Sequence, residues 1–465
     1  MPLHDSALPS FDTVLDRADS RARGKAQRAV APRGALAEHP DHPRDPVAHL
    51  REQNTTRLAD LVPLRMQRML ASPFAFYRGT AGLMAADLAD APTSGILVAA
   101  CGDAHLSNFG FYASPERRLV FDLNDFDEAA IAPWEWDVKR LVTSVVIGGR
   151  HNGYPAREVE RICRTAVADY LAALRGLLAA SATERYFMHV NLDLARSRMT
   201  KSGRRVLASA EEGARKRTGE RTLRRVTERG EDGRLRFVER EPVMLRLGPD
   251  EIAEASGGEP AAAITDLFRA YRRTVGIDVD TVLSQYRPTD LARRVVGVGS
   301  VGTRCYVQLL EGADGDALIL QVKEAGPSVL ARYGGIAQTS RIERGISEGG
   351  EGSRVVGIQR VLQAVSDPFL GWFRSNGRDY YVRQFKDMKG SIDLDGLPLD
   401  AFSDYVEACA IVLGRAHAQS PTAGEVIGYA GRKDTAARAI LDWSLAYAEL
   451  SLADFEAVRV AFADT

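Results

Sequence analysis

Apolar residues return every three or four positions over several long parts of the chain, which is the spacing of amphipathic helices. Residues 47–70 follow this pattern with a break at Pro63, and the pattern resumes after Pro73. Residues 137–180 predict two long helices, and residues 398–460 predict a further helical part. Most of the chain is therefore expected to be helical.

Strand patterns occur first near residue 100. An apolar run at 96–100 is followed by a polar turn, and short strands are expected at 109–112 and 117–123. A Ser-Pro-Glu turn joins the two later strands, which predicts a hairpin. The segment after this hairpin is again polar, so two polar loops flank it.

A second group of strands lies in the last third of the chain. Residues 293–325 predict an antiparallel meander of three strands, whose first turn at 297–302 is rich in glycine. A helix is expected at 353–367, followed by a hairpin at 369–388 with an Asn-Gly turn. These segments predict a small sheet that packs against one helix.

The chain is thus expected to have the fold class α+β, with parts that differ in composition. Residues 196–229 are polar and basic, and we interpret them as a solvated surface or a mobile loop, with recognition of an acidic acceptor as the alternative. The expected parts are a polar, loose leader at 1–45, a helical lobe at 46–289, a small β-rich lobe at 290–395, and C-terminal helices at 396–465 that pack on the helical lobe.

Composition and charge limit the functional classes. The content of 45% hydrophobic and 26% charged residues is typical of globular proteins. A formal net charge of −1 gives no overall reason to expect nucleic acid or an anionic membrane as a partner. The four cysteines are widely spaced, and neither a signal peptide nor an apolar run of about 18 residues occurs. We therefore expect a cytoplasmic protein without a membrane span.

The polar turn after residue 100 reads "CGDAHLSN" and holds the first candidate site residues, Asp103 and Asn108. Asp125 and Asp127 follow the predicted hairpin, which returns the chain to the same place. Converging carboxylates are costly to desolvate without a cation, and Mg²⁺ accepts carboxylate and amide oxygens while leaving positions for phosphate. Phosphoryl transfer needs such a cation and a carboxylate that orients the acceptor hydroxyl, a role suited to Asp103.

The segment "CGDAHLSN" resembles the H-G-D-x-H-x-x-N catalytic loop of the aminoglycoside phosphotransferase and choline kinase branch of the protein-kinase-like superfamily, with Cys101 in place of the first His. The segment "NDFDEAAIAPWEWDVKRL" is similar to the I-D-W-E-D-A … D-L-A segment of that branch. The resemblance implies that Asp125 binds metal, with Asp122 as the competing choice. It also implies that His105 and Asp137 are largely structural.

The segment "GVGSVG" resembles the glycine-rich loop that covers phosphates in kinases, and "LILQVKEA" resembles the strand that carries the phosphate-binding lysine. The resemblance implies that Gly297, Gly299, Ser300 and Gly302 contact a nucleotide and that Lys323 neutralises its phosphates. In kinases these elements precede the catalytic loop, whereas here they follow it. The resemblance therefore implies a two-lobed, circularly permuted kinase-like fold that binds ATP and Mg²⁺ between its lobes.

Residues 45–455 also resemble an uncharacterised bacterial family, domain of unknown function 2252, which implies a kinase-like fold but supplies no substrate. The chain departs from the kinase pattern at one position. The predicted helix at 353–367 lacks the glutamate that holds a kinase lysine, since Glu343, Glu348 and Glu351 all precede it.

Together these features favour an ATP- and Mg²⁺-dependent phosphotransferase that acts on an unknown hydroxyl acceptor, either a small molecule or a protein. A nucleotide-binding module without turnover is one alternative, and a metal-dependent phosphoesterase is another, because "GDAH" overlaps its motif. Arg78 either contacts substrate or phosphate, or pairs with a core carboxylate. Structural interpretations also stay open: Asp103, His105 and Asn108 as turn residues, the glycines as an ordinary hairpin turn and Lys323 as a solvated lysine.

Overall fold

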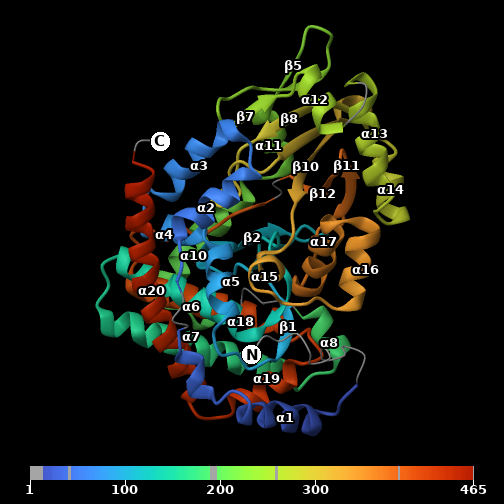
Figure 1. Cartoon of the computed structure of the whole chain (residues 1–465). Helices are drawn as coiled ribbons and strands as arrows, with labels where there is room; N and C mark the ends of the chain where they lie inside the picture. Colours follow the sequence, from blue (N-terminus) through green and yellow to red (C-terminus); the bar gives the residue numbers. More distant parts are fainter. Residues whose placement is uncertain (1–13, 40–42, 189–195, 257–259, 386–387, 464–465) are drawn as a thin grey trace.

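The structure is a computed structural model that describes residues 14–39, 43–188, 196–256, 260–385 and 388–463. It is a mixed α+β structure in which a small antiparallel sheet lies at one end of a larger body of helices (Figure 1). Within the described residues, none of the helices combines the length and the apolar character needed to cross a membrane.

The helical body is built around one long helix that is buried along most of its length. This helix, α6, contains apolar side chains on all sides, among them Val138, Leu141 and Val142, which explains why its neighbours surround it. The two long helices expected at 137–180 are confirmed as α6 and α7. The main helices of this body are α6 (Trp134–His151), α7 (Ala156–Leu177), α18 (Leu399–His417), α19 (Ala423–Ala430) and α20 (Thr435–Ala461).

Short helices near the N-terminus complete the body. Pro63 lies in the first turn of a helix. Its missing N–H costs nothing there, because the N–H groups of the first turn have no partner within the helix. These helices lie between α20 and the small sheet (Figure 1). They are α2 (Pro46–Thr55), α3 (Val62–Met69), α4 (Pro73–Arg78) and α5 (Ala81–Ala89).

The expected loose leader is wrong for residues 14–39. Helix α1 (Arg17–Ala26) packs against α19, and its buried residues are Ser20 and Gly24. Gly24 lies against the backbone of Glu425, so the two helices approach closely where the side chains are small. The remainder of the expected leader, residues 1–13 and 40–42, lies outside the described residues.

For residues 196–229 the mobile-loop interpretation is wrong, because the segment is mostly helical, whereas few of its side chains are buried, in agreement with a solvated surface. Thr200 and Thr218 cap the two principal helices by accepting backbone N–H groups with their hydroxyls. The elements in this segment are α10 (Lys201–Arg215), α11 (Gly219–Val226) and β5 (Thr227–Arg229); α8 (Ala182–Phe187) precedes it and β6 (Leu235–Phe237) follows it.

The small sheet has the order β11-β12-β10-β9-β8-β7, with antiparallel neighbours throughout. The predicted meander and hairpin are confirmed, and Asn376 and Gly377 both have positive φ in the hairpin turn. The sheet takes in residues 244–246, which lie before the expected lobe boundary at 290. Its strands are β7 (Met244–Arg246), β8 (Arg287–Arg294), β9 (Cys305–Glu311), β10 (Ala317–Ala325), β11 (Gly371–Ser375) and β12 (Arg378–Gln384).

The two faces of this sheet pack against different elements. On β10, Leu320 and Val322 belong to a cluster with α13, whereas Ile319 packs with Val226 of α11 and Phe237 of β6. Lys323 has the same strand parity as Ile319 and therefore shares its face. The surrounding helices are α12 (Pro249–Ser256), α13 (Pro260–Arg272), α14 (Ile277–Leu283), α15 (Val329–Arg332), α16 (Ser340–Gly349) and α17 (Glu351–Leu362).

Two small ladders position the polar loops between the helical body and the sheet. β1 (Leu97–Ala100) pairs with β4 (Ala130–Pro133), and β2 (Phe109–Ala113) pairs with β3 (Leu119–Leu123). In the first ladder Ala100 lies opposite Ala130. The turn after β1 and the loop before β4 therefore start and end side by side, and the predicted convergence of these two polar loops is confirmed.

Candidate functional site

The turn after β1 is held by a carboxylate from the start of α6. Asp137 accepts the backbone N–H of Cys101 at 2.6 Å and that of Gly102 at 2.9 Å. Gly102 has a φ of +80°, and a Cβ there would lie 2.2 Å from the carbonyl oxygen of Glu128, so only glycine fits. The ring of His417 on α18 also contacts Asp137, at 3.1 Å. Asp137 therefore holds the turn, and His417 supports Asp137 from α18.

Asp103 projects from this turn into a cleft and is held by a buried arginine. Arg140 on α6 donates from Nε to Asp103 Oδ1 at 2.8 Å, and the Asp103 side chain remains 19% exposed. Burial raises the pKa of Asp103 above its ordinary value, and the charge of Arg140 opposes this shift. Asp103 thus combines a fixed orientation with a carboxyl group that accepts a proton more readily than a solvated aspartate does.

Asn108 and His105 occupy the same turn in different ways. The amide nitrogen of Asn108 donates to the backbone carbonyl of Asp103 at 2.7 Å, which leaves its side-chain carbonyl oxygen for another partner. His105 lies 3.6 Å from Asp103 through Nε2, while its Nδ1 is buried without a partner among the described residues. Burial lowers the pKa of His105 well below its ordinary value, so the ring is neutral near pH 7.

Lys323 of β10 reaches the second polar loop and joins the sheet to the helical body. Its Nζ lies 2.5 Å from Asp127 Oδ2 and 3.5 Å from Asp125 Oδ1. The hydroxyl of Tyr381, the cross-strand neighbour of Lys323, donates to Asp127 Oδ1 at 2.6 Å. Burial opposes both charges, yet the pKa of Lys323 lies well above and that of Asp125 well below the ordinary value, because each ion stabilises the other.

Of the two competing aspartates, the structure brings Asp125 and not Asp122 to Lys323. The side chain of Asp125 is 33% exposed in the cleft. Asp122 is 2% exposed and accepts the backbone N–H groups of Ala364 at 2.9 Å and Leu123 at 2.8 Å. Asp122 therefore ties the hairpin to the end of α17, and burial raises its pKa.

The helix that packs on the sheet contributes an arginine to the second loop. Arg354 of α17 donates to the carbonyl oxygens of Asp127 and Ala129, and to that of Gly326 after β10. Glu351 pairs with Arg354, not with Lys323. Helix α17 thus orients the backbone of the acidic loop, while loop aspartates pair with the lysine.

The glycine-rich loop between β8 and β9 is supported by the N-terminal helices. Arg57 donates to the carbonyl of Val301 at 2.7 Å, and Arg68 donates to that of Gly297 at 2.9 Å. Gly297 has a φ of +70°, which favours glycine. At the tip of the loop, Gly299 lies against the backbone at the end of α4.

These features surround one cleft with a volume of about 540 Å³, which is large enough for a small-molecule ligand. Lys323 and Gly302 are not among the residues that line the cleft. Lys323 contacts the lining residues Asp125 and Asp127, and Gly302 lies against the lining residue Arg57. The predicted site residues that line the cleft are Arg78, Asp103, His105, Asn108, Asp125, Asp127, Gly297, Gly299 and Ser300.

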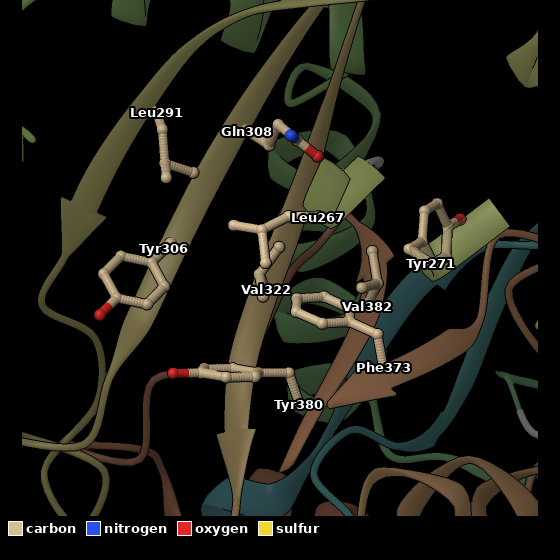
Figure 2. Close-up of a pocket in the computed structure, with 9 residues that line it drawn as sticks. All are labelled: Leu267, Tyr271, Leu291, Tyr306, Gln308, Val322, Phe373, Tyr380 and Val382. Carbon is tan, nitrogen blue, oxygen red and sulfur yellow. The ribbon is translucent and has the colours of Figure 1, made fainter. Parts of the chain in front are cut away.

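A second cavity lies on the opposite face of the sheet, below α13 (Figure 2). Tyr380 and Phe373 of the sheet and Leu267 of α13 point into it, and its volume of about 20 Å³ has room for about one water. This cavity is a packing space and is separate from the acidic cleft.

The sequence patterns did not identify several residues that shape the cleft. The sequence does contain a local indication of Arg140, because this residue follows Asp137 by three positions and therefore shares a helix face with it. Arg354 and Tyr381 have no comparable signal, since their contacts depend on how α17 and β12 dock. Among the described residues no group of three or more His, Cys, Asp or Glu side chains forms a ready metal centre.

Residues 57–461 match the model of a family described as an uncharacterised protein conserved in bacteria, DUF2252. The comparison with curated proteins and the comparison with solved structures give no match.

Proposed function

The chain belongs to this bacterial family, DUF2252, and we propose that it is an ATP- and Mg²⁺-dependent phosphotransferase with a circularly permuted kinase-like fold. One observation carries the proposal. Lys323 meets Asp125 and Asp127, nearly two hundred residues earlier in the chain, at a cleft that also contains Asp103 and a glycine-rich loop. Phosphoryl transfer needs this combination of a base, a cation and phosphate donors in one place.

In the proposed reaction Asp103 orients the hydroxyl of the acceptor. The hydroxyl oxygen forms a bond to the γ-phosphorus, and the bond between that phosphorus and the β–γ bridging oxygen breaks. ADP leaves with the bonding electron pair, and the hydroxyl proton passes to Asp103. Arg140 keeps the carboxylate in place, and the pKa of Asp103, raised by burial, suits it to accept the proton.

The donor set at the loop fits Mg²⁺. Asp125 offers a partly exposed carboxylate, and Asn108 offers the carbonyl oxygen that its amide hydrogen bond leaves free. Two protein oxygens suffice, because Mg²⁺ keeps several waters and takes its other ligands from phosphates. When bound, the ion would neutralise charge on the phosphates. Asp127, which accepts from both Lys323 and Tyr381, would keep Lys323 in place with Asp125 as a metal ligand.

The glycine-rich loop supplies the other side of the phosphate site. Gly297, Gly299 and Ser300 line the cleft, and the loop carbonyls of Gly297 and Val301 are already taken by arginines. The N–H of Val301 donates within the loop to the carbonyl of Val298 at 3.3 Å, whereas the described chain gives the N–H groups of Gly299 and Ser300 no backbone acceptor, so these two are available to phosphate oxygens. The acceptor hydroxyl would enter between this loop and Asp103.

A second candidate function, a nucleotide-binding module without turnover, is favoured by one contact. Lys323 pairs with the carboxylate of Asp125 itself, so metal binding has to break an existing ion pair. We do not propose a metal-dependent phosphoesterase, because the described residues do not gather the several ligands that such a centre uses.

The proposal is tested with the purified full chain, MgCl₂ and ATP labelled at the γ-phosphate. We expect ADP to form and label to appear on water, on the chain or on an added hydroxyl acceptor. Asp103→Asn should lower ADP formation by orders of magnitude while ATP binding persists. ATP binding without any ADP formation would favour the module without turnover, and phosphate release from an aryl phosphate without ATP would overturn the proposal.

A further inference from the structure

Arg78, the last residue of α4, is a partly buried cation at the cleft without a protein acceptor. Its guanidinium makes no hydrogen bond and no ion pair with any residue that the structure describes, and its Nε is buried without a partner. Burial lowers the pKa of Arg78, and the charge of Asp103 offsets part of this effect. A desolvated guanidinium without acceptors is unfavourable, so its position calls for an anionic partner.

The other arginines that line the cleft differ from Arg78 because each has a protein acceptor. Their partners lie at the rim or in the glycine-rich loop and satisfy at least part of each guanidinium. Arg304 pairs with Glu324 at 3.5 Å, Arg378 with Glu324 at 3.1 Å, Arg332 with Glu52 at 2.9 Å, and Arg57 donates to Val301 at 2.7 Å. Within the part of the chain that the structure describes, Arg78 is therefore the cleft arginine whose guanidinium has no protein acceptor at all, whereas Arg57 leaves only its Nε buried without a partner.

Pairing with a core carboxylate, the structural alternative for Arg78, does not occur in this arrangement. Arg140 pairs with Asp103, the carboxylate whose charge acts on Arg78, and is itself buried against the ring of Tyr77 at 3.9 Å. The electrostatic influence of Arg78 still reaches both Asp103 and His105. Arg78 thus lies beside the proposed base without being neutralised by it.

The backbone around Arg78 places it at the tip of the glycine-rich loop. Gly299 lies against the carbonyl of Arg78 and the Cα of Gly79. Helix α4 is anchored, because Phe76 and Tyr77 are fully buried and the Tyr77 hydroxyl donates to the carbonyl of Arg140 at 2.9 Å. Arg78 therefore lines the cleft from a fixed backbone beside the glycine-rich loop, and its charge acts on Asp103.

We propose that Arg78 binds the phosphoryl group that is being transferred, by donating from its guanidinium to the γ-phosphate oxygens of a nucleoside triphosphate. This inference rests on the proposed function and adds a catalytic residue from the N-terminal helices. Charge on those oxygens must be compensated while the β–γ bond breaks, and a guanidinium suits their geometry. The N-terminal segment then completes a site whose other residues come from the two lobes.

The test compares Arg78→Gln and Arg78→Lys with the wild-type chain, with Arg161→Gln on the exposed surface of α7 as the matched control. Calorimetry measures binding of Mg·ADP, of Mg with a non-hydrolysable ATP analogue, and of Mg·ADP with aluminium fluoride. We expect Arg78→Gln to leave ADP affinity unchanged, to weaken the ATP analogue about tenfold and to weaken the fluoride complex more. ADP formation should fall about 10³-fold, with partial recovery in Arg78→Lys.

The outcomes separate this inference from the proposed function. If the wild-type chain binds nucleotide and forms ADP, but Arg78→Gln weakens ADP and the ATP analogue equally or neither, the role of Arg78 is overturned and the phosphotransferase stands. If the wild-type chain binds no nucleotide, both are overturned. Thermal unfolding of each variant checks the fold, and Arg78→Lys, which keeps the charge, gives the same comparison if Arg78→Gln does not fold.

Discussion

The two acidic ends of the cleft are held by different kinds of contact. Asp103 pairs with Arg140, 37 residues away and within the helical body, whereas Asp127 pairs with Lys323, 196 residues away and on the small sheet. The first pair lies wholly within the helical body, whereas the second joins that body to the sheet. The base is therefore built by the local fold, while the phosphate-binding side depends on how the two parts meet.

The largest effect is expected from a substitution that changes only the Asp103 end of the cleft. Asp103→Asn removes the proton acceptor but keeps the size of the side chain, so ADP formation should fall about 10²–10⁴-fold, the range for a general base. Affinity for Mg·ATP should stay nearly unchanged, because Asp103 is not proposed to bind metal or phosphate. Single-turnover measurements at saturating ATP separate the two quantities.

The matched control for this substitution is Asp442→Asn on the exposed face of α20, which should behave as the wild type. An Asp103→Asn chain with unchanged turnover would remove Asp103 from the reaction. Equal losses of affinity and turnover would instead place Asp103 among the binding groups.

The second largest effect is expected from a substitution at the Lys323 end of the cleft, where the sheet meets the helical body. Lys323→Met removes the cation shared by Asp125 and Asp127, so turnover should fall about 10²–10³-fold, the scale for one lost electrostatic donor. Unlike Asp103→Asn, it should also weaken Mg·ATP binding and speed amide hydrogen exchange in β10 and in the acidic loop. The exposed Lys433→Met is the control. Faster exchange in Asp103→Asn as well would contradict the contrast between the two ends.

The sequence also predicted the Asp103 end of the cleft better than the Lys323 end. The strands around the acidic turn, the hairpin, the meander and the helix that packs on the sheet all follow from periodicity and turn residues, and the structure confirms them. Asp103, Asn108 and Asp125 line one cleft because short ladders bring their loops together. The residues that form such contacts are close together in the sequence, so local sequence patterns predict the contacts.

The parts that the sequence failed to predict depend on distant packing. Helix α1 buries Ser20 and Gly24, so its contact surface consists of small residues and gives no apolar periodicity. Helix α11 buries only Thr222 and Val226 of a strongly basic segment. The register that places Tyr381 opposite Lys323 likewise arises only when β10 and β12 pair.

A smaller effect concerns the support of the Asp103 end. Asp137→Asn replaces one carboxylate oxygen that accepts from the turn backbone by an amide N–H group, so one buried N–H loses its acceptor. We expect the free energy of unfolding to fall by about 2 kcal/mol, the scale for a hydrogen bond to a charged group. Denaturant titration measures this loss, and a stability equal to that of the wild type would show that the turn does not depend on Asp137.

A further effect, which depends on pH, lies between the two ends at Glu128, whose carboxylate accepts the backbone N–H of Val329 at 2.8 Å. Burial raises the pKa of Glu128 to about 7 from an ordinary value of 4.5. Between these values the folded chain keeps a proton that the unfolded chain releases, so the free energy of unfolding should decrease as the pH rises through this window.

Glu128→Gln removes this titration and should therefore gain stability relative to the wild type as the pH goes from about 5 to about 8. Urea midpoints of both chains at the two pH values measure the difference, and Glu348→Gln on the exposed side of α16 is the control. An equal difference at both pH values would mean that Glu128 has the same pKa in both states. Because Glu128 lies between Asp127 and the strand β4 that pairs with β1, a changed pKa after Lys323→Met would show that docking of the sheet sets its burial.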